Sequence, residues 1–600
     1  MNKTPQRNEV PVKDTWDLSS LFAMEEEWDA TLAQFKGMID QAAQYKGTLG
    51  TSSDALYAVL GWYIDASQKI ERLGNYAFLR FSVDGTNTDC QKRMGLVQQA
   101  ATDFSAATSW FDPEIQAVDS HKLDSWLAEE RFTDYRIMVA RLIRFKPHVL
   151  TENEEKLLAL ASDATTVSRT AFQDLTNIDM DFGMITTPEG DLPLTQTTWS
   201  SFMNNPDREL RKSVYRQFYK VYATHKHVLG RLYEGSVKKD IFKANSRAFP
   251  SARAAALFPD NVPMEVYDSL VSSVHDALPL LHRYYDIRRR ALGLDKLAHY
   301  DVYVPLVSGV DTVTPYDEAV GIIAAALKPL GDEYGATITA GLTTERWVDR
   351  YENVAKRSGA FSSGAFSGKP YIMMNYKEDV LRDVFTLAHE GGHSMHSWYS
   401  ARNNPYPHYD YTIFEAEVAS TFNEQLVAKY LFDTAKDDKM RAYIIGKQID
   451  DLLATLFRQT MFAEYEDIIH RQAEEGEPIT LEGLRSTYRG LLVQYFGSLV
   501  EFEENSDLEG LRIPHFYNAF YVYKYATGIS AAIALSDKVL SGTTNDRDAY
   551  LSFLKSGGSL FPIDSLKKAG VDMSSPEPVR AATRKFASLL DQFEELTIGK

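Results

Sequence analysis

Hydrophobic residues recur at helical spacing over most of the chain. The clearest early example is spaced i, i+4, i+7 and i+11 and comprises Trp28, Leu32, Phe35 and Ile39. The same pattern continues in three long segments with few Gly or Pro, around 54–110, 119–144 and 152–175. This pattern predicts that the N-terminal part of the protein is built from helices.

Extended character interrupts the helices near residue 185. Residues 180–185 and 192–194 read as strands, and residues 188–191 between them contain Pro and Gly, so we expect a hairpin. A new helix is then expected to begin with Asn205 as its cap and Pro206 in its first position. Helical patterns dominate from there to the end of the chain.

The length of the chain bears on its domain organisation. Six hundred residues are too many for one compact core, so we expect two lobes. We place the boundary after the hairpin, which predicts an N-terminal helical lobe at 1–200 and a second domain at 201–600.

One later stretch also departs from the helical pattern. Gly359, Gly364 and Gly368 punctuate it, and residues 371–376 read as a strand. We therefore expect a small β-sheet here. Beside an active site, such a strand and loop would hold an extended peptide by strand addition; an ordinary core strand fits the pattern equally well.

The segment after this strand carries the main chemical motif. Residues 389–393 read His-Glu-Gly-Gly-His and continue an amphipathic helical pattern. Positions i and i+4 lie on one face of a helix, so His389 and His393 can bind one metal ion. Glu390 is then close enough to act as general base on a metal-bound water, the arrangement of zinc peptidases. Two glycines in a helix interior are costly, and their small size would let another backbone or a substrate approach closely.

A catalytic zinc ion usually has three protein ligands. The extended motif with a third His is excluded, because residue 399 is Tyr. The helical segment 412–432 offers Glu415 and Glu417, which lie about 200° apart on a helix, so at most one of them faces the metal. We choose Glu417 as ligand, because it aligns with Glu424, a candidate partner for a ligand His. Two solvent-facing glutamates remain an alternative.

Charge and composition narrow the function classes. The net charge of −19 argues against nucleic acid as a partner and fits a soluble cytoplasmic protein. The single cysteine, Cys90, cannot form an internal disulfide. The N-terminus lacks the apolar core of a signal peptide, and the longest apolar stretch, 319–327, is too short to span a bilayer. The sequence does not indicate an oligomeric state.

The motif and its spacing resemble oligoendopeptidase F, within the thimet-oligopeptidase-like metallopeptidases. Glu417 follows the histidine motif by 24 residues, and residues 16–22 (WDLSSLF) and 359–362 (GAFS) are also similar to that family. The resemblance implies a mainly α, zincin-like fold in which two helical lobes enclose a deep substrate channel. It further implies one zinc ion per chain, short peptides as substrates, and Gly359 and Ala360 as substrate-binding residues.

A Tyr-rich segment near the C-terminus is also similar to the family, where it supplies hydroxyl donors to the scissile carbonyl. Tyr517, Tyr521 and Tyr525 are spaced by four, so they would share one face of a helix. We favour Tyr521 and Tyr525 as donors, then His515, and take Tyr517 as a substrate contact. Aromatic core packing is the alternative for some of these residues.

The sequence therefore predicts a zinc-dependent endopeptidase that cleaves short peptides by means of a metal-activated water. A zinc carboxypeptidase of related helical fold is an alternative, but it would need a cationic clamp for the substrate C-terminus, and no Arg or Lys can be assigned to that role. A non-catalytic helical binding protein with a coincidental motif is a more distant alternative.

Overall fold

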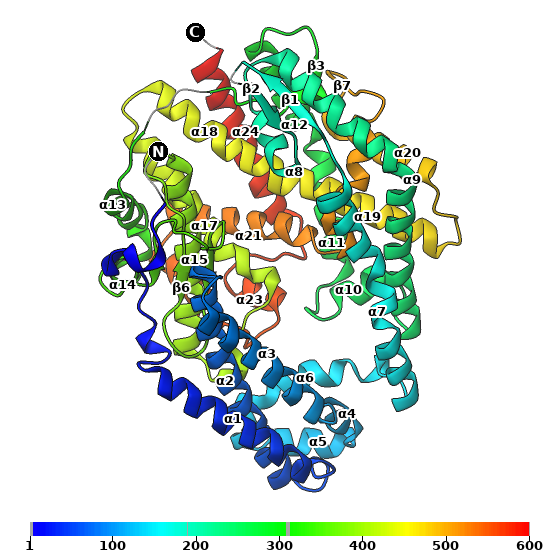
Figure 1. Cartoon of the computed structure of the whole chain (residues 1–600), viewed down its shortest axis with the longest axis vertical. Coiled ribbons are helices and arrows are strands. Elements are labelled where there is room, and N and C mark those ends of the chain that lie inside the picture. Colours follow the sequence, from blue (N-terminus) through cyan, green and yellow to red (C-terminus); the bar gives the residue numbers. More distant parts are fainter. Residues whose placement is uncertain (1–3, 189, 308–311, 599–600) are drawn as a thin grey trace. The chain divides into compact units, whose positions relative to one another are not determined.

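The computed structural model describes residues 4–188, 190–307 and 312–598, and the chain forms two compact units. The first unit comprises Met1–Pro147, Asp311–Asp433 and Ala531–Asp572, and the second comprises His148–Val310, Thr434–Ser530 and Met573–Lys600. The chain is mainly α-helical with small β-sheets, as the sequence predicted (Figure 1). Among the described residues, no helix is long and apolar enough to cross a membrane.

The N-terminal helices of the first unit share one hydrophobic core. The helices of this unit are α1 (Glu25–Tyr45), α2 (Ser53–Val83), α3 (Thr88–Ala107), α4 (Phe111–Ala117), α5 (Ser120–Leu127), α6 (Arg136–Arg144), α13 (Tyr316–Ala326), α14 (Asp332–Leu342), α15 (Leu381–Asn403), α16 (Tyr406–Tyr409), α17 (Ile413–Thr434), α22 (Thr544–Ser556) and α23 (Pro562–Lys568). Trp28, Leu32 and Phe35 on α1 are buried in this core and Ile39 packs against it, which confirms the predicted helical face.

A three-stranded sheet in the first unit has the order β4-β6-β5. The central strand β6 (Tyr371–Met373) runs parallel to β4 (Val348–Asp349) and antiparallel to β5 (Phe361–Ser363), with Ser362 opposite Ile372. The predicted strand is thus confirmed, although it is shorter than 371–376. In the described sheet β5 is an edge strand, so one side of its backbone is unpaired by other strands.

The second unit contains the predicted hairpin and the longest described helix, α9 (Arg208–Ser246). Strands β1 (Met184–Thr187) and β2 (Gly190–Pro193) pair antiparallel, which confirms the hairpin, and β3 (Leu297–Ala298) pairs with β7 (Val500–Glu501). The helices are α7 (Glu152–Asp174), α8 (Gln196–Met203), α9 (Arg208–Ser246), α10 (Ala252–Leu257), α11 (Met264–Asp276), α12 (Leu278–Ala291), α18 (Asp438–Leu452), α19 (Arg458–Glu474), α20 (Leu481–Phe496) and α24 (Glu577–Thr597); α21 (Tyr523–Ser541) begins in this unit and ends in the first.

The start of α9 differs from the prediction. The cap is Asp207, not Asn205, because the Asp207 carboxylate accepts hydrogen bonds from the amides of Glu209 and Leu210. An anionic cap also interacts favourably with the helix dipole. The Asn205 side chain instead accepts a bond from the Asp207 amide and so orders the turn before the helix.

Candidate active site

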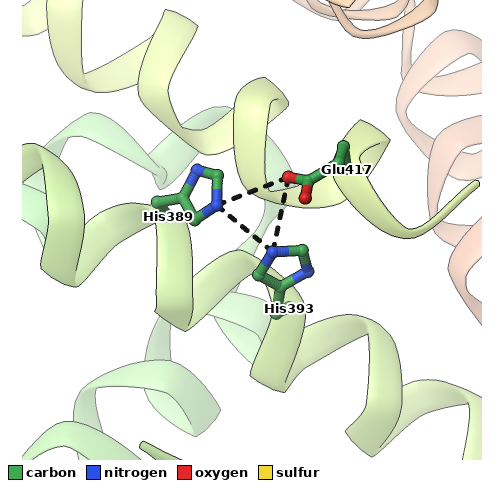
Figure 2. Close-up of side chains that lie close together, drawn as sticks. All are labelled: His389, His393 and Glu417. Carbon is green, nitrogen blue, oxygen red and sulfur yellow. Dashed lines mark hydrogen bonds and ion pairs between the residues drawn. The ribbon is translucent and has the colours of Figure 1, made fainter. Parts of the chain in front are cut away.

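Helices α15 and α17 bring together the three residues that the sequence selected as metal ligands. His389 and His393 lie one turn apart on α15, and Glu417 reaches them from α17 (Figure 2). The two Nε2 atoms are 3.2 Å apart, and Oε2 of Glu417 is 3.4 Å from Nε2 of His389 and 3.5 Å from Nε2 of His393.

This triangle has the dimensions of one face of a tetrahedral metal site. With metal–donor bonds of about 2.0–2.1 Å, tetrahedral geometry places neighbouring donor atoms about 3.3–3.4 Å apart. Two imidazole nitrogens and one carboxylate oxygen are also the donor set of a catalytic zinc site with an open fourth position. Among the described residues this is the one group of at least three His, Cys, Asp or Glu side chains placed to hold a metal ion.

The main chains of the two helices approach closely at Gly392. A Cβ at this position would lie 2.7 Å from Cα of Ser420. The side-chain amide of Asn423 donates to the carbonyl oxygen of Ala388 at 3.2 Å, and the Tyr334 hydroxyl donates to Asn423 at 3.1 Å. The sequence did not single out Asn423 or Tyr334, although the paired glycines did signal a close approach.

A carboxylate on α17 orients the His389 ring. Nδ1 of His389 donates to Oε1 of Glu424 at 3.1 Å, which leaves Nε2 of the same ring directed at Glu417. Burial alone would lower the pKa of His389, but the hydrogen bond and the negative charge of Glu424 outweigh it and raise the pKa to about 9. Glu424 therefore lies where the sequence placed it, behind a histidine of the motif.

The Glu417 carboxylate is held as the ionised form. Burial would raise its pKa, but the two imidazoles and the Ser420 hydroxyl outweigh burial and lower the pKa to about 2. Ser420 donates to Oε2 of Glu417 at 3.1 Å. Glu415, the other candidate, is buried and accepts hydrogen bonds from Thr412. It does not join the two histidines, which agrees with the expectation that Glu415 and Glu417 face different sides of the helix.

Glu390 lies beside the two histidines and is 7% exposed. Burial raises the pKa of its carboxyl group, while the histidines and the backbone amide of Ser362 lower it. Ser362 belongs to β5, and its hydroxyl is 2.8 Å from the hydroxyl of Ser394 on α15. This contact joins the edge strand to the motif helix next to Glu390.

The predicted substrate-binding residues Gly359 and Ala360 precede β5. The Asn375 side-chain amide holds this segment, because it donates to the carbonyl oxygens of Arg357 at 3.0 Å and of Gly359 at 2.9 Å. Gly359 has φ of +86°, a conformation that favours glycine. Both residues line a hollow that also includes Thr386 on α15.

The Tyr-rich segment lies in the second unit and is not one helix. Asn518 and Phe520 have non-helical backbone angles, with φ of +58° at Phe520, and α21 begins at Tyr523. The expectation that Tyr517, Tyr521 and Tyr525 share one helix face is therefore wrong.

Three of the four predicted residues still cluster. The ring centroid of His515 is 6.3 Å from that of Tyr521 and 6.1 Å from that of Tyr525, and the two tyrosine rings are 5.4 Å apart. All three side chains are partly exposed. Tyr517 is 3% exposed and stacks on Phe172 with a centroid distance of 4.4 Å, so it packs in the core, apart from this cluster.

Comparison with known proteins gives matches over nearly the whole chain. The profile of Peptidase family M3 matches residues 201–585, and that of Oligopeptidase F matches residues 114–182. An oligoendopeptidase F homolog of Borreliella burgdorferi is 41% identical over 98% of this chain and 99% of its own length. Oligopeptidase PepF of Bacillus subtilis is 42% identical over 99% of this chain and 89% of its own length.

Solved structures agree with these sequence matches. The crystal structure of oligoendopeptidase-F from Enterococcus faecium superposes with a TM-score of 0.74 at 32% identity, covering 96% of this chain and all of that chain. A peptidase structure from Chlamydophila abortus superposes with a TM-score of 0.92 at 36% identity, covering 99% of this chain and all of that one.

Proposed function

Since the chain belongs to peptidase family M3, we propose that His389, His393 and Glu417 hold one zinc ion per chain at the centre of its active site. The protein is a metallo-endopeptidase that acts on oligopeptides. The carboxypeptidase alternative is not favoured, because similar relatives are named as oligoendopeptidases. The observation that carries the zinc assignment is the triangle of donor atoms, which matches a tetrahedral face.

A zinc ion at this position would supply Lewis-acid activation of a bound water and of the scissile carbonyl. We assign the proton transfers to Glu390. Its carboxylate accepts a proton from the attacking water and delivers it to the leaving amine. Burial supports this role, since a raised pKa makes the carboxylate a stronger base towards the attacking water, while the protonated carboxyl remains acidic enough to donate to the leaving amine.

We assign the stabilisation of the developing oxyanion to the cluster in the second unit. Tyr521 and Tyr525 each carry a hydroxyl donor, and His515 carries a ring N–H. Their partial exposure and mutual proximity support the assignment. We do not retain Tyr517, because it packs inside the core.

We propose that Gly359 and Ala360 bind the peptide backbone by strand addition to the edge strand β5. Two features support this role: β5 is unpaired on one side in the described sheet, and Asn375 holds the preceding segment in place. We also propose that residues 201–600 form the catalytic domain along the sequence, with 1–200 as an N-terminal lobe; the match of the M3 profile from residue 201 supports this division. This sequence division differs from the compact units of the fold, in which Met1–Pro147 belongs to the same unit as the metal ligands.

The remaining proposals concern the setting of the enzyme. We propose that it acts on short peptides in the cytoplasm, without a nucleic acid or membrane partner. The net charge of −19 supports the exclusion of nucleic acid, which is bound by basic surfaces. Cell fractionation followed by immunoblotting tests the location.

The decisive experiment measures zinc content and peptide cleavage together. An internally quenched, end-blocked peptide of about eight to ten residues is incubated with purified protein before and after chelation and after zinc is restored. We expect one zinc per chain, loss of internal cleavage on chelation and recovery with zinc. Cleavage that survives complete removal of metal, or a metal content well below one per chain in active protein, would refute the assignment.

A further inference from the structure

A hollow of about 530 Å³ in the first unit lies beside the segment that leads into β5. Its wall includes Gly359 and Ala360 before the strand, Asn375 after β6, and Thr386 on α15. Every residue that lines this hollow belongs to the first unit. The hollow is thus built from the same elements that carry the metal ligands.

Basic side chains outnumber acidic ones in the lining of the hollow, although the chain as a whole carries a net charge of −19. The charged side chains that line it are four basic and two acidic: Lys356, Arg357, Lys377, Arg382, Glu352 and Asp383. The side chain of Lys356 is fully buried, and its ammonium group pairs with the carboxylate of Asp349 at 2.7 Å.

The other three basic residues, Arg357, Lys377 and Arg382, are exposed. Over residues 4–188, 190–307 and 312–598, no salt bridge or side-chain hydrogen bond is formed by any of the three. Asp383 in the same lining attracts Lys377 and Arg382 electrostatically, and Arg357 lies over the rings of Phe78 and Phe361. Within the same described ranges none of the three cations forms a hydrogen-bonded ion pair, so their N–H donors can still bind an anion that enters the hollow. This is the local charge that a ligand carboxylate requires.

The position of the hollow relative to Glu390 follows from helix geometry. Arg382, Thr386 and Glu390 are spaced by four, so they share one face of α15. At 1.5 Å per residue, Thr386 and Arg382 lie about 6 Å and 12 Å from Glu390 along the helix axis. An extended peptide advances about 3.3 Å per residue, so this interval corresponds to about two to four substrate residues.

We take the peptide to pair antiparallel with β5, because antiparallel pairing is slightly more stable per residue than parallel pairing. The backbone amide of Ser362 faces the catalytic Glu390, and Ala360 lies two residues earlier, at the hollow. A peptide that adds antiparallel to β5 runs past Ser362 first and past Ala360 afterwards. The residues that reach the hollow are therefore those on the C-terminal side of the scissile bond.

We infer that this hollow is a substrate subsite for a carboxylate located two to four residues beyond the scissile bond. The inference rests on the proposed function and extends it to substrate selection. The carboxylate has two sources, the side chain of Asp or Glu and the free C-terminus of a short peptide. Both present the same planar anion to Arg and Lys.

The test compares matched peptides on wild-type and variant enzyme. The substrates are quenched, end-blocked peptides with one cleavage site. Gln at the second, third or fourth residue after the scissile bond is replaced in turn by Glu or Lys. A further peptide keeps Gln throughout but ends at the fourth following residue with a free carboxylate. The enzymes are wild type, the Lys377→Gln/Arg382→Gln double variant, and Lys36→Gln, which removes an exposed charge on α1.

We expect kcat/KM of wild type to favour Glu over Gln by about 5- to 30-fold at one or more of these positions, with Lys disfavoured, and the ratio to fall as salt rises. The double variant should lose the preference, whereas Lys36→Gln should keep it. The ratio of kcat/KM for the Glu peptide to kcat/KM for the Gln peptide is unaffected by any loss of activity that is common to both substrates. A preference that appears only with the free carboxylate assigns the site to the peptide C-terminus.

Two results would overturn the inference. One is equal cleavage of Glu, Gln and free-carboxylate peptides by wild type, and the other is an unchanged ratio in the double variant. Failure of the proposed function gives a different result, because no peptide of the series would then show chelator-sensitive cleavage.

Discussion

Gly392 in the motif helix lies against the main chain of Ala419 in α17, so that a Cβ at position 392 would come within 2.5 Å of the Ala419 carbonyl oxygen. Backbone atoms cannot move aside as a flexible side chain can. The second glycine of the motif is therefore what allows α17 to approach α15 closely enough for Glu417 to reach the two histidines.

Gly392→Ala is expected to push the two helices apart and to lower both zinc content and kcat/KM by at least about 10-fold, because the three donor atoms would no longer meet. Metal analysis and peptide cleavage check this. Gly95→Ala is the matched control, since Gly95 lies in α3 with open space where a Cβ would point, and this variant should keep full activity. Normal zinc content in Gly392→Ala would contradict the packing argument.

Glu390→Gln is expected to retain zinc and to lose about 10²–10⁴-fold in kcat, because Gln cannot accept the proton of the attacking water. Glu417→Gln should instead lose zinc, since it replaces an anionic donor with a neutral one. Metal content and kcat measured on both variants separate the two roles. Near-normal turnover by metal-replete Glu390→Gln would refute the assignment of the base.

Glu424→Gln is expected to weaken zinc binding by about 10–100-fold, because the charged partner of the His389 ring is lost while its shape is kept. Zinc affinity is measured by competition with a chelator of known strength. At saturating zinc the variant should regain most of its activity, unlike Glu390→Gln. Unchanged affinity would show that the 3.1 Å contact with His389 does not support the metal site.

Tyr521→Phe and Tyr525→Phe test the oxyanion donors. Removal of the hydroxyl that faces the scissile carbonyl should lower kcat by about 10²–10³-fold with a smaller effect on KM. Tyr517→Phe is the matched control, because Tyr517 is packed on Phe172 and its hydroxyl is expected to play no catalytic part. If all three variants had the kcat of wild type, Tyr521 and Tyr525 would be excluded from this role.

Glu71 on α2 links stability to pH. Burial, together with Asp410, raises the pKa of Glu71 to about 7, although the Phe366 amide donates to it. The folded state then holds more protons than the unfolded state between about pH 4.5 and 7, so this group's contribution to stability falls as pH rises through that window. Glu71→Gln should therefore be more stable than wild type by about 1–2 kcal/mol at pH 8 and equal to it near pH 4.5.

Urea unfolding of the full-length protein at both pH values checks this prediction. Glu26→Gln serves as the control, because Glu26 is an exposed residue of the same unit and should shift the midpoint little at either pH. A stabilisation of Glu71→Gln that is the same at pH 4.5 and pH 8 would contradict the proposed protonation.

The local sequence pattern was sufficient to predict several helices and strands of this protein and the placement of several side chains. Helical periodicity identified the buried face of α1, and residue types and spacing identified the hairpin and the strand β6. The i, i+4 spacing of His389 and His393 predicted a shared helix face, and the angular argument separated Glu417 from Glu415. These geometric expectations agree with the structure because each depends on one helix, one strand or one short hairpin, while the role of Glu417 as a metal ligand stays a prediction.

Other predictions failed where the local geometry changed over a few residues. The four-residue spacing of the tyrosines predicted one helix from Tyr517 onward, but a left-handed residue at Phe520 delays the helix to Tyr523. Similarly, the cap of α9 is Asp207 and not the predicted Asn205, because the Asp207 carboxylate accepts hydrogen bonds from two backbone amides. Spacing alone carries no information about such breaks.

The sequence by itself determined the helical class, the two histidines and the carboxylates that accompany them, because those features are set by residue type and by the repeat of a helix. Only the tertiary structure decided which atoms meet. The contact of Gly392 with α17, the bond from Asn423 to Ala388, and the assembly of basic side chains around the hollow join segments separated in the chain. Such contacts depend on how backbones pack against one another, and that packing is a property of the whole fold.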